Sequence, residues 1–233
     1  MHRDLIQIAK NIIDSANSNG FNLKAFGRIG VALSCELDSI ETSDIDLFGT
    51  DIKEDLLIKF FEKIGFRNKS VMPVLIKFWN DDRSVIVDVY LNELTFAFTI
   101  PGPFEPSGQY TIPITQLFLS KLYFNDKQWS KKDKEDLISI LRTHDFGRDK
   151  HSDKIQLGIL QDIWCCNSDS HAIFTFCEKK LIALIEYCDD ECVKEKIEYL
   201  LEFIRKTPKK CPYKFGKSIH YGSPNDVEDA FVG

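Results

Sequence analysis

Two carboxylates that could bind a metal stand close together early in the chain. Asp44 and Asp46 flank Ile45 in the segment Ser-Asp-Ile-Asp-Leu-Phe, residues 43–48. On a β-strand, side chains two residues apart point to the same face, so both carboxylates would project together. Adjacent carboxylates repel each other unless a cation, a proton or hydrogen bonds compensate, and Mg²⁺ is a hard cation that prefers oxygen ligands. The spacing predicts a divalent metal site. The alternative is that one aspartate caps the next helix and the other ends the strand in solvent.

A third carboxylate, Asp88, stands inside the β-rich run Val85–Leu91. A charge in such a strand is costly to bury without a partner. Three arrangements remain open: its face is exposed to solvent, a nearby Arg or Lys pairs with it, or it joins Asp44 and Asp46 on a metal.

Glycines precede the aspartate pair at a predicted junction between a strand and a helix. The apolar run Leu23–Ile29, with Gly27 inside it, predicts a strand, and Gly30 followed by Val31 begins a short helix. There the backbone can approach a phosphate, which free N–H groups and the helix dipole favour. The alternative is a glycine that only lets the helix pack on the sheet. The pattern is neither a Walker A loop nor a Rossmann fingerprint.

Hydrophobic periodicity indicates the elements that must position these residues. The predicted class is α+β with a mixed sheet, because β runs follow one another after residue 70 instead of alternating with helices. The predicted early elements are a helix over 4–18, strands over 23–29 and 45–48, a helix over 52–64, and β runs over 71–79, 85–91 and 94–100. Helices follow at about 115–125, 130–142, 153–165, 171–187 and 190–206.

The chain divides, on composition, into three parts. A loop rich in proline and glycine near residue 105 separates a predicted α/β core, 1–105, from a helical domain, 106–206. A tail, 207–233, is poor in aliphatic residues. Its lysines form a basic stretch with Tyr213 and Phe215 between them, which is either a solvated tail or a contact for a polyanion.

Charge and composition exclude some classes of protein. The 233 residues carry a net charge of −6, which argues against a protein that coats nucleic acid through a global positive field. Charged residues interrupt every apolar run, so no membrane association is expected. Seven cysteines without a C-x-x-C pair, and an N-terminus without a signal-peptide pattern, indicate a cytoplasmic protein.

The ordered set of glycine turn, aspartate pair and later lone aspartate resembles the nucleotidyltransferase superfamily typified by DNA polymerase β. The resemblance continues in residues 110–122, Tyr-Thr-Ile-Pro to Lys-Leu, and in Lys-Asp-Lys-Glu-Asp-Leu at 132–137. Both segments are similar to those of a small bacterial branch of standalone proteins, related in outline to toxin and phage-defence components. The resemblance covers roughly residues 20–165.

The resemblance implies roles for individual residues. Asp44 and Asp46 would hold Mg²⁺ against a nucleoside triphosphate, and Asp88 would share a second Mg²⁺ or act as general base. The Gly30–Val31 turn would cradle the phosphates. Lys121 would neutralise phosphate, unless it is an ordinary solvated helix lysine. Asp136 would orient Lys121 or the base, unless it is a surface charge.

The same resemblance implies transfer of a nucleotidyl group from an NTP to a hydroxyl on an acceptor. The acceptor is a protein, an RNA or a small molecule, and an antitoxin-like partner protein is expected. One departure matters: Val31 stands where the family has Gly or Ser. It leaves open an alternative, a degenerate member that acts as a nucleotide- or partner-binding module.

Overall fold

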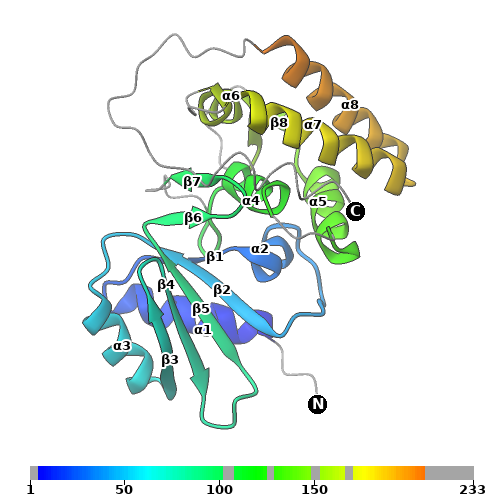
Figure 1. The fold of residues 1–233 in the computed structure, drawn as a ribbon. Coiled ribbons are helices and arrows are strands. Elements are labelled where there is room, and N and C mark those ends of the chain that lie inside the picture. Colours follow the sequence, from blue (N-terminus) through cyan, green and yellow to red (C-terminus); the bar gives the residue numbers. More distant parts are fainter. Residues whose placement is uncertain (1–4, 102–107, 125–128, 148–152, 166–169, 208–233) are drawn as a thin grey trace. The chain divides into compact units, whose positions relative to one another are not determined.

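The computed structural model describes residues 5–101, 108–124, 129–147, 153–165 and 170–207 (Figure 1). The chain forms two compact units, the first made of Met1–Leu94 with Pro101–Leu117, and the second of Thr95–Ile100 with Phe118–Gly233. The domain limits predicted from composition remain predictions. The basic tail after residue 207 lies outside the described residues. None of the helices in the described ranges is long and apolar enough to cross a membrane.

A five-stranded sheet forms the centre of the first unit, in the order β1-β2-β5-β4-β3. Strands β2 and β5 pair in parallel, whereas the other neighbours pair antiparallel. The predicted α+β class with a mixed sheet is therefore confirmed. The strands are β1 Leu23–Ala25, β2 Asp44–Gly49, β3 Phe66–Met72, β4 Leu75–Asn80 and β5 Ile86–Leu91.

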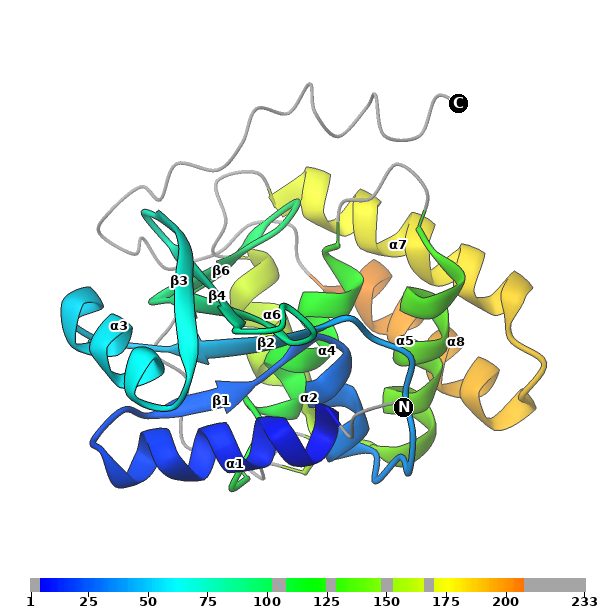
Figure 2. The same cartoon turned by 90° about the horizontal axis from the view of Figure 1, so that it is seen from below.

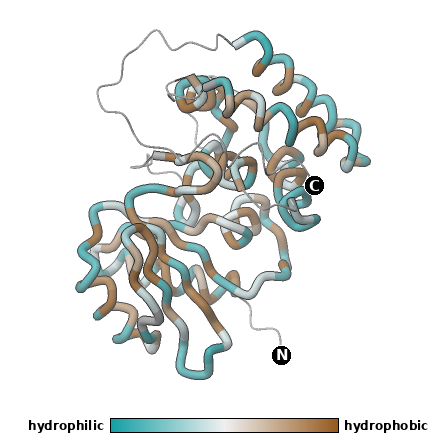
Figure 3. The backbone as a smooth tube through the Cα atoms, in the orientation of Figure 1, coloured by the Kyte–Doolittle hydropathy of each residue, from teal (hydrophilic) through white to brown (hydrophobic). Residues whose placement is uncertain are grey.

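One face of this sheet forms a hydrophobic core with two helices, α1 (Leu5–Ser18) and α3 (Glu54–Lys63) (Figure 2). The strands alternate, so every second residue of β2, β4 and β5 points into this core. The tube in Figure 3 shows hydrophobic stretches, in brown, along the strands of the sheet. Phe61 of α3 stacks on Phe78 of β4, with 4.0 Å between the ring centroids. The sheet residues of the core with no exposed surface are Leu23, Ala25, Ile45, Leu47, Ile76, Phe78, Val87 and Val89.

Because side chains alternate along each strand, the charged residues lie on the opposite face of the sheet. Asp44 and Asp46 alternate with buried residues of β2, and Lys77 alternates with buried residues of β4. The short helix α2 (Gly27–Ser34) follows β1 directly. The fold therefore leaves one face of the sheet for polar chemistry while the other face carries the packing that stabilises it.

The predicted strand over 23–29 is wrong in its length. β1 ends at Ala25, and α2 begins at Gly27, so the junction lies three residues earlier than the one predicted at Gly30. The cause is Gly27 itself, whose φ of 60° lies in the left-handed region and ends the extended backbone.

The predicted β run over 71–79 is strand except at two residues, because it joins the end of β3 to most of β4. It contains the turn at residues 73–74, which joins β3 to β4, and the sequence did not predict β3 as a separate strand beginning at Phe66. Proline at 73 cannot donate to a ladder, which is why the run breaks there. The run over 94–100 forms two short paired strands, β6 (Glu93–Thr95) and β7 (Thr99–Pro101).

Helices make up most of the second unit, as predicted. α4 begins in the first unit and continues into the second, and the remaining helices pack through contacts of α5 with α8, α6 with α7, and α7 with α8 (Figure 1). The elements are α4 Ile114–Leu122, α5 Lys131–Thr143, β8 Phe146–Gly147, β9 Ile155–Gln156, α6 Leu157–Cys165, α7 Ser170–Tyr187 and α8 Glu191–Lys206.

Candidate active site

The parallel pairing of β2 with β5 brings the three predicted carboxylates to one face of the sheet. Asp46 lies opposite Asp88 in the ladder, and Asp44 lies opposite Ile86, two residues before Asp88. Residues that are partners in a ladder, or two apart on one strand, share a face. The three carboxylates therefore stand on the face away from the hydrophobic core, at the centre of the sheet.

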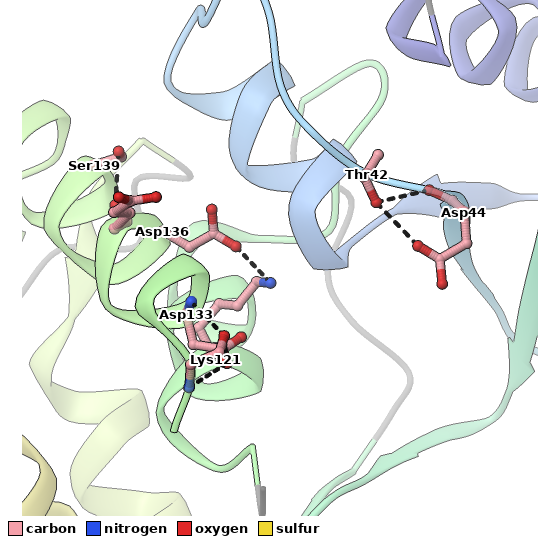
Figure 4. A network of polar contacts seen from close by, with 8 residues as sticks. Thr42, Asp44, Lys121, Asp133, Asp136 and Ser139 are labelled. Carbon is pink, nitrogen blue, oxygen red and sulfur yellow. Dashed lines mark hydrogen bonds and ion pairs between the residues drawn. The ribbon is translucent and has the colours of Figure 1, made fainter. Parts of the chain in front are cut away.

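Asp44 is held from the loop that precedes β2. The hydroxyl of Thr42 donates a hydrogen bond to Asp44 Oδ1 at 3.0 Å (Figure 4). This bond fixes one carboxylate oxygen and leaves the second oxygen's lone pairs directed elsewhere, so Asp44 keeps the capacity to contact a cation.

Asp88 is buried, with 5% of its surface exposed. The ammonium of Lys77, its ladder partner on β4, donates to Asp88 Oδ2. Asp88 Oδ1 is also buried and, among the described residues, has no hydrogen-bond partner. The structure thus pairs Asp88 with a lysine, one of the three arrangements that the sequence leaves open.

The side chain of Tyr90 lies in the negative electrostatic field of the three carboxylates. It follows Asp88 by two residues on β5, and its ring packs edge-on against Phe26. Burial of the hydroxyl raises the pKa of Tyr90 well above its ordinary value, and the negative charges of Asp46, Asp88 and Asp44 raise it further. The pKa of this one phenol therefore depends on the charges of all three carboxylates.

Gly27 is the glycine that lies against the carboxylates. A Cβ added to it would stand 2.1 Å from Asp46 Oδ2, and its φ of 60° disfavours other residues. The backbone N–H of Phe26 donates to the Asp46 carbonyl at 3.0 Å, and Gly30 donates the first intrahelical bond, to the Phe26 carbonyl. The first turn of α2 therefore starts beside Asp46, and the N–H groups of a first turn have no acceptor within their own helix.

Gly30 and Val31 lie inside α2 and are buried. A Cβ at Gly30 would stand 3.1 Å from both the Ala25 carbonyl and Leu117 Cδ1. Gly30 thus lets α2 pack closely on β1 and on the first turn of α4. The strand-to-helix junction, to which the phosphate role was assigned, lies at Gly27 instead.

Lys121 and Asp136 form a buried ion pair within the second unit. Lys121 Nζ lies 2.7 Å from Asp136 Oδ2, and the two residues are 9% and 3% exposed (Figure 4). Lys121 is thus not a solvated helix lysine, and Asp136 is not a surface charge. Asp136 holds Lys121, which is one of the roles predicted for it. Phosphate neutralisation by Lys121 stays a prediction.

The fit of a magnesium ion can be judged from the donor set. Across the described ranges, no group of three or more His, Cys, Asp or Glu side chains could hold a metal ion. Mg²⁺ in nucleotide sites is usually bound by one or two carboxylates together with substrate phosphates and water, without a cage made only of protein. Asp44 and Asp46, adjacent on one face of β2, match that requirement.

Sequence reasoning missed three residues of this face: Gly27, Lys77 and Tyr90. Tyr90 carried a signal, because it stands two residues after Asp88 in the same β run. The sequence signal for Gly27 was weaker: glycine readily adopts the backbone angles that end a strand. No sequence signal pointed to Lys77, because its pairing with Asp88 depends on the register of β4 with β5.

No protein-family model matches the chain, and no curated protein does. Among solved structures, the chain is similar to the antibiotic-resistance factor ANT(2'')-Ia, with 13% identity over 61% of this chain and 85% of that one and a TM-score of 0.47. It is also similar to the lincosamide antibiotic adenylyltransferase LnuA bound to lincomycin, with 15% identity over 59% and 96% of the two chains and a TM-score of 0.47. A third is an antigenic nucleotidyltransferase-like protein from Paracoccidioides brasiliensis, with 14% identity over 89% and 94% and a TM-score of 0.45.

Proposed function

We propose that this protein is a magnesium-dependent nucleotidyltransferase. It would transfer a nucleotidyl group from an NTP to a hydroxyl on a protein, an RNA or a small molecule. The observation that carries the proposal is the ladder of β2 with β5, which sets Asp44, Asp46 and Asp88 on one polar face beside the first turn of α2.

Asp44 and Asp46 would hold Mg²⁺, each through a carboxylate oxygen. Bound there, the ion would supply positive charge that stabilises the phosphoryl oxygens as charge develops on them. Thr42 would keep Asp44 oriented through its hydrogen bond. Asp88, beside this pair, is the residue proposed as general base for the acceptor hydroxyl or as a further metal ligand.

The first turn of α2 is the proposed phosphate site. Its N–H groups and the positive end of the helix dipole favour an anion. Gly27 starts this turn against Asp46, so phosphate oxygens bound at the turn would stand near the ion held by Asp44 and Asp46. Val31 is buried inside α2, so the departure at this position affects packing of the helix and not the donors of its first turn.

The chemistry balances without a further reactant. The acceptor oxygen forms a bond to the α-phosphorus, the bond from that phosphorus to the bridging oxygen breaks, pyrophosphate leaves, and the hydroxyl proton passes to a base. One observation favours a second candidate, nucleotide binding without transfer: the Lys77 ammonium occupies one oxygen of Asp88, the residue proposed as base.

A binding experiment tests the part that both candidates share. Unfolding temperature is measured with each common NTP, with and without Mg²⁺, for the wild type and for Asp44→Asn with Asp46→Asn. We expect Mg²⁺-dependent stabilisation by at least one NTP in the wild type and none in the double variant. Lys59→Met, at an exposed position on α3, serves as the control and should behave as the wild type. Absence of stabilisation by every NTP would contradict the proposal.

A further inference from the structure

We infer that Lys77 is the second cation of the carboxylate site. On this account, which rests on the proposed function, Lys77 takes the position beside Asp88 that a second divalent ion would otherwise fill. The chain then binds one divalent ion with each nucleotide, at Asp44 and Asp46.

The sheet fixes Lys77 in place. β4 lies next to β5, and Lys77 is the ladder partner of Asp88, which in turn is the ladder partner of Asp46 on β2. The three residues therefore form one row across three adjacent strands and share a face. The ammonium reaches Asp88 because the backbone register puts it there, so the pair does not depend on a flexible loop.

Neither oxygen of Asp88 is open to a divalent ion while Lys77 is paired. Oδ2 accepts a hydrogen bond from the Lys77 ammonium, and Oδ1 is buried. Mg²⁺ sits about 2.1 Å from its oxygen ligands and keeps several waters. An ion on Oδ2 would stand close to the ammonium and be repelled by it, and a hydrated ion does not reach an enclosed Oδ1.

The exposed fractions of the Lys77 and Asp88 side chains agree with a role for Lys77 as the cation beside Asp88. The side chain of Asp88 is 7% exposed, whereas that of Lys77 is 30% exposed. The lysine is therefore the more exposed member of the pair, and its charge offsets a carboxylate charge that burial would otherwise make costly. Asp44 and Asp46 are both less buried than Asp88, and on this account they are the carboxylates that would contact an ion arriving with a nucleotide.

The number of ions bound per chain tests the inference directly. Native mass spectrometry of the full chain, with Mn²⁺ and a non-hydrolysable NTP analogue, counts the ions on each analogue-bound molecule. We expect one Mn²⁺ for the wild type, for Lys77→Arg and for the exposed-lysine control Lys59→Met. Lys77→Met frees Asp88 and should bind two.

A second variant keeps the test decisive if Lys77→Met does not fold. Asp88→Asn should still bind one ion, because Asp88 is not a ligand in the wild type. Two ions on the wild type, one ion on a folded Lys77→Met, or loss of the ion in Asp88→Asn would each overturn the inference and leave the proposed function standing. A wild type that binds neither analogue nor ion would overturn the proposed function, and the inference with it.

Discussion

Asp46 of β2 and Asp88 of β5 lie directly opposite each other in a parallel ladder. Antiparallel strands that are consecutive in the chain need only a turn, but a parallel pair joins segments separated by other elements. Here α3, β3 and β4 lie between the two strands in sequence. The juxtaposition of these carboxylates is therefore a property of the sheet topology, and it gives the site a rigid base.

Gly27 is expected to tolerate no side chain. Gly27→Ala should lower the free energy of unfolding by about 2–4 kcal/mol, because it adds a clash with Asp46 Oδ2 to a left-handed backbone. Gly20 is a matched control: its φ is 84°, and a Cβ there meets nothing within 4 Å. Gly20→Ala should cost about 1 kcal/mol. Urea denaturation measures both, and equal costs would contradict a steric role for Gly27.

The buried pair of Lys121 with Asp136 should be strongly coupled. Either Lys121→Met or Asp136→Asn removes one partner of a buried ion pair, and each should cost about 3–5 kcal/mol. The double variant should cost less than the sum of the two. Lys131 with Glu135, an exposed pair on α5, provides the control, and Lys131→Met should cost under about 0.5 kcal/mol. Additive effects at Lys121 and Asp136 in a double-mutant cycle would contradict the coupling.

Asp190 should make stability depend on pH at the acid end. A hydrogen bond from Arg142 and one from the Val193 backbone lower the pKa of Asp190 below its ordinary value of 3.8. Because the folded-state pKa is depressed, the contribution is present above about pH 3.8 and is lost as pH falls through the folded value.

The variant Asp190→Asn should therefore be less stable than the wild type at pH 7, and the difference should shrink progressively below pH 3.8. Urea denaturation at a series of pH values checks this. Asp189→Asn, at the exposed neighbouring position, is the control and should change little at any pH. A difference for Asp190→Asn that does not vary with pH would contradict the account.

Local pattern was enough to predict most helices and the strand of the aspartate pair. The helices α5, α7 and α8 end within one or two residues of their predicted limits, because each carries a long apolar periodicity. Ser130 and Asp133 add a capping box at the start of α5. Alternation likewise predicted that Asp44 and Asp46 share a face, which the burial of Ile45 and Leu47 confirms.

Three features of the structure were not predicted from the sequence, because hydrophobic periodicity does not determine them. The break between β3 and β4 is set by a two-residue turn inside a β-rich run. The end of β1 is set by the backbone angle of Gly27. The pairing of Lys77 with Asp88 is set by strand register, which is fixed only when the whole sheet forms. Each is a tertiary or turn effect that overrides the local pattern.

Nucleotidyl transfer by this protein should depend on the aspartate pair. The most direct measurement incubates the protein with Mg²⁺, cell extract and each common NTP labelled at the α-phosphate, then follows label into protein, RNA and small-molecule fractions. We predict stable label in one fraction with the wild type, at least about 100-fold less with Asp44→Asn, and none from a γ-labelled NTP. Absence of label from every fraction with every NTP, or equal labelling by Asp44→Asn, would contradict the claim.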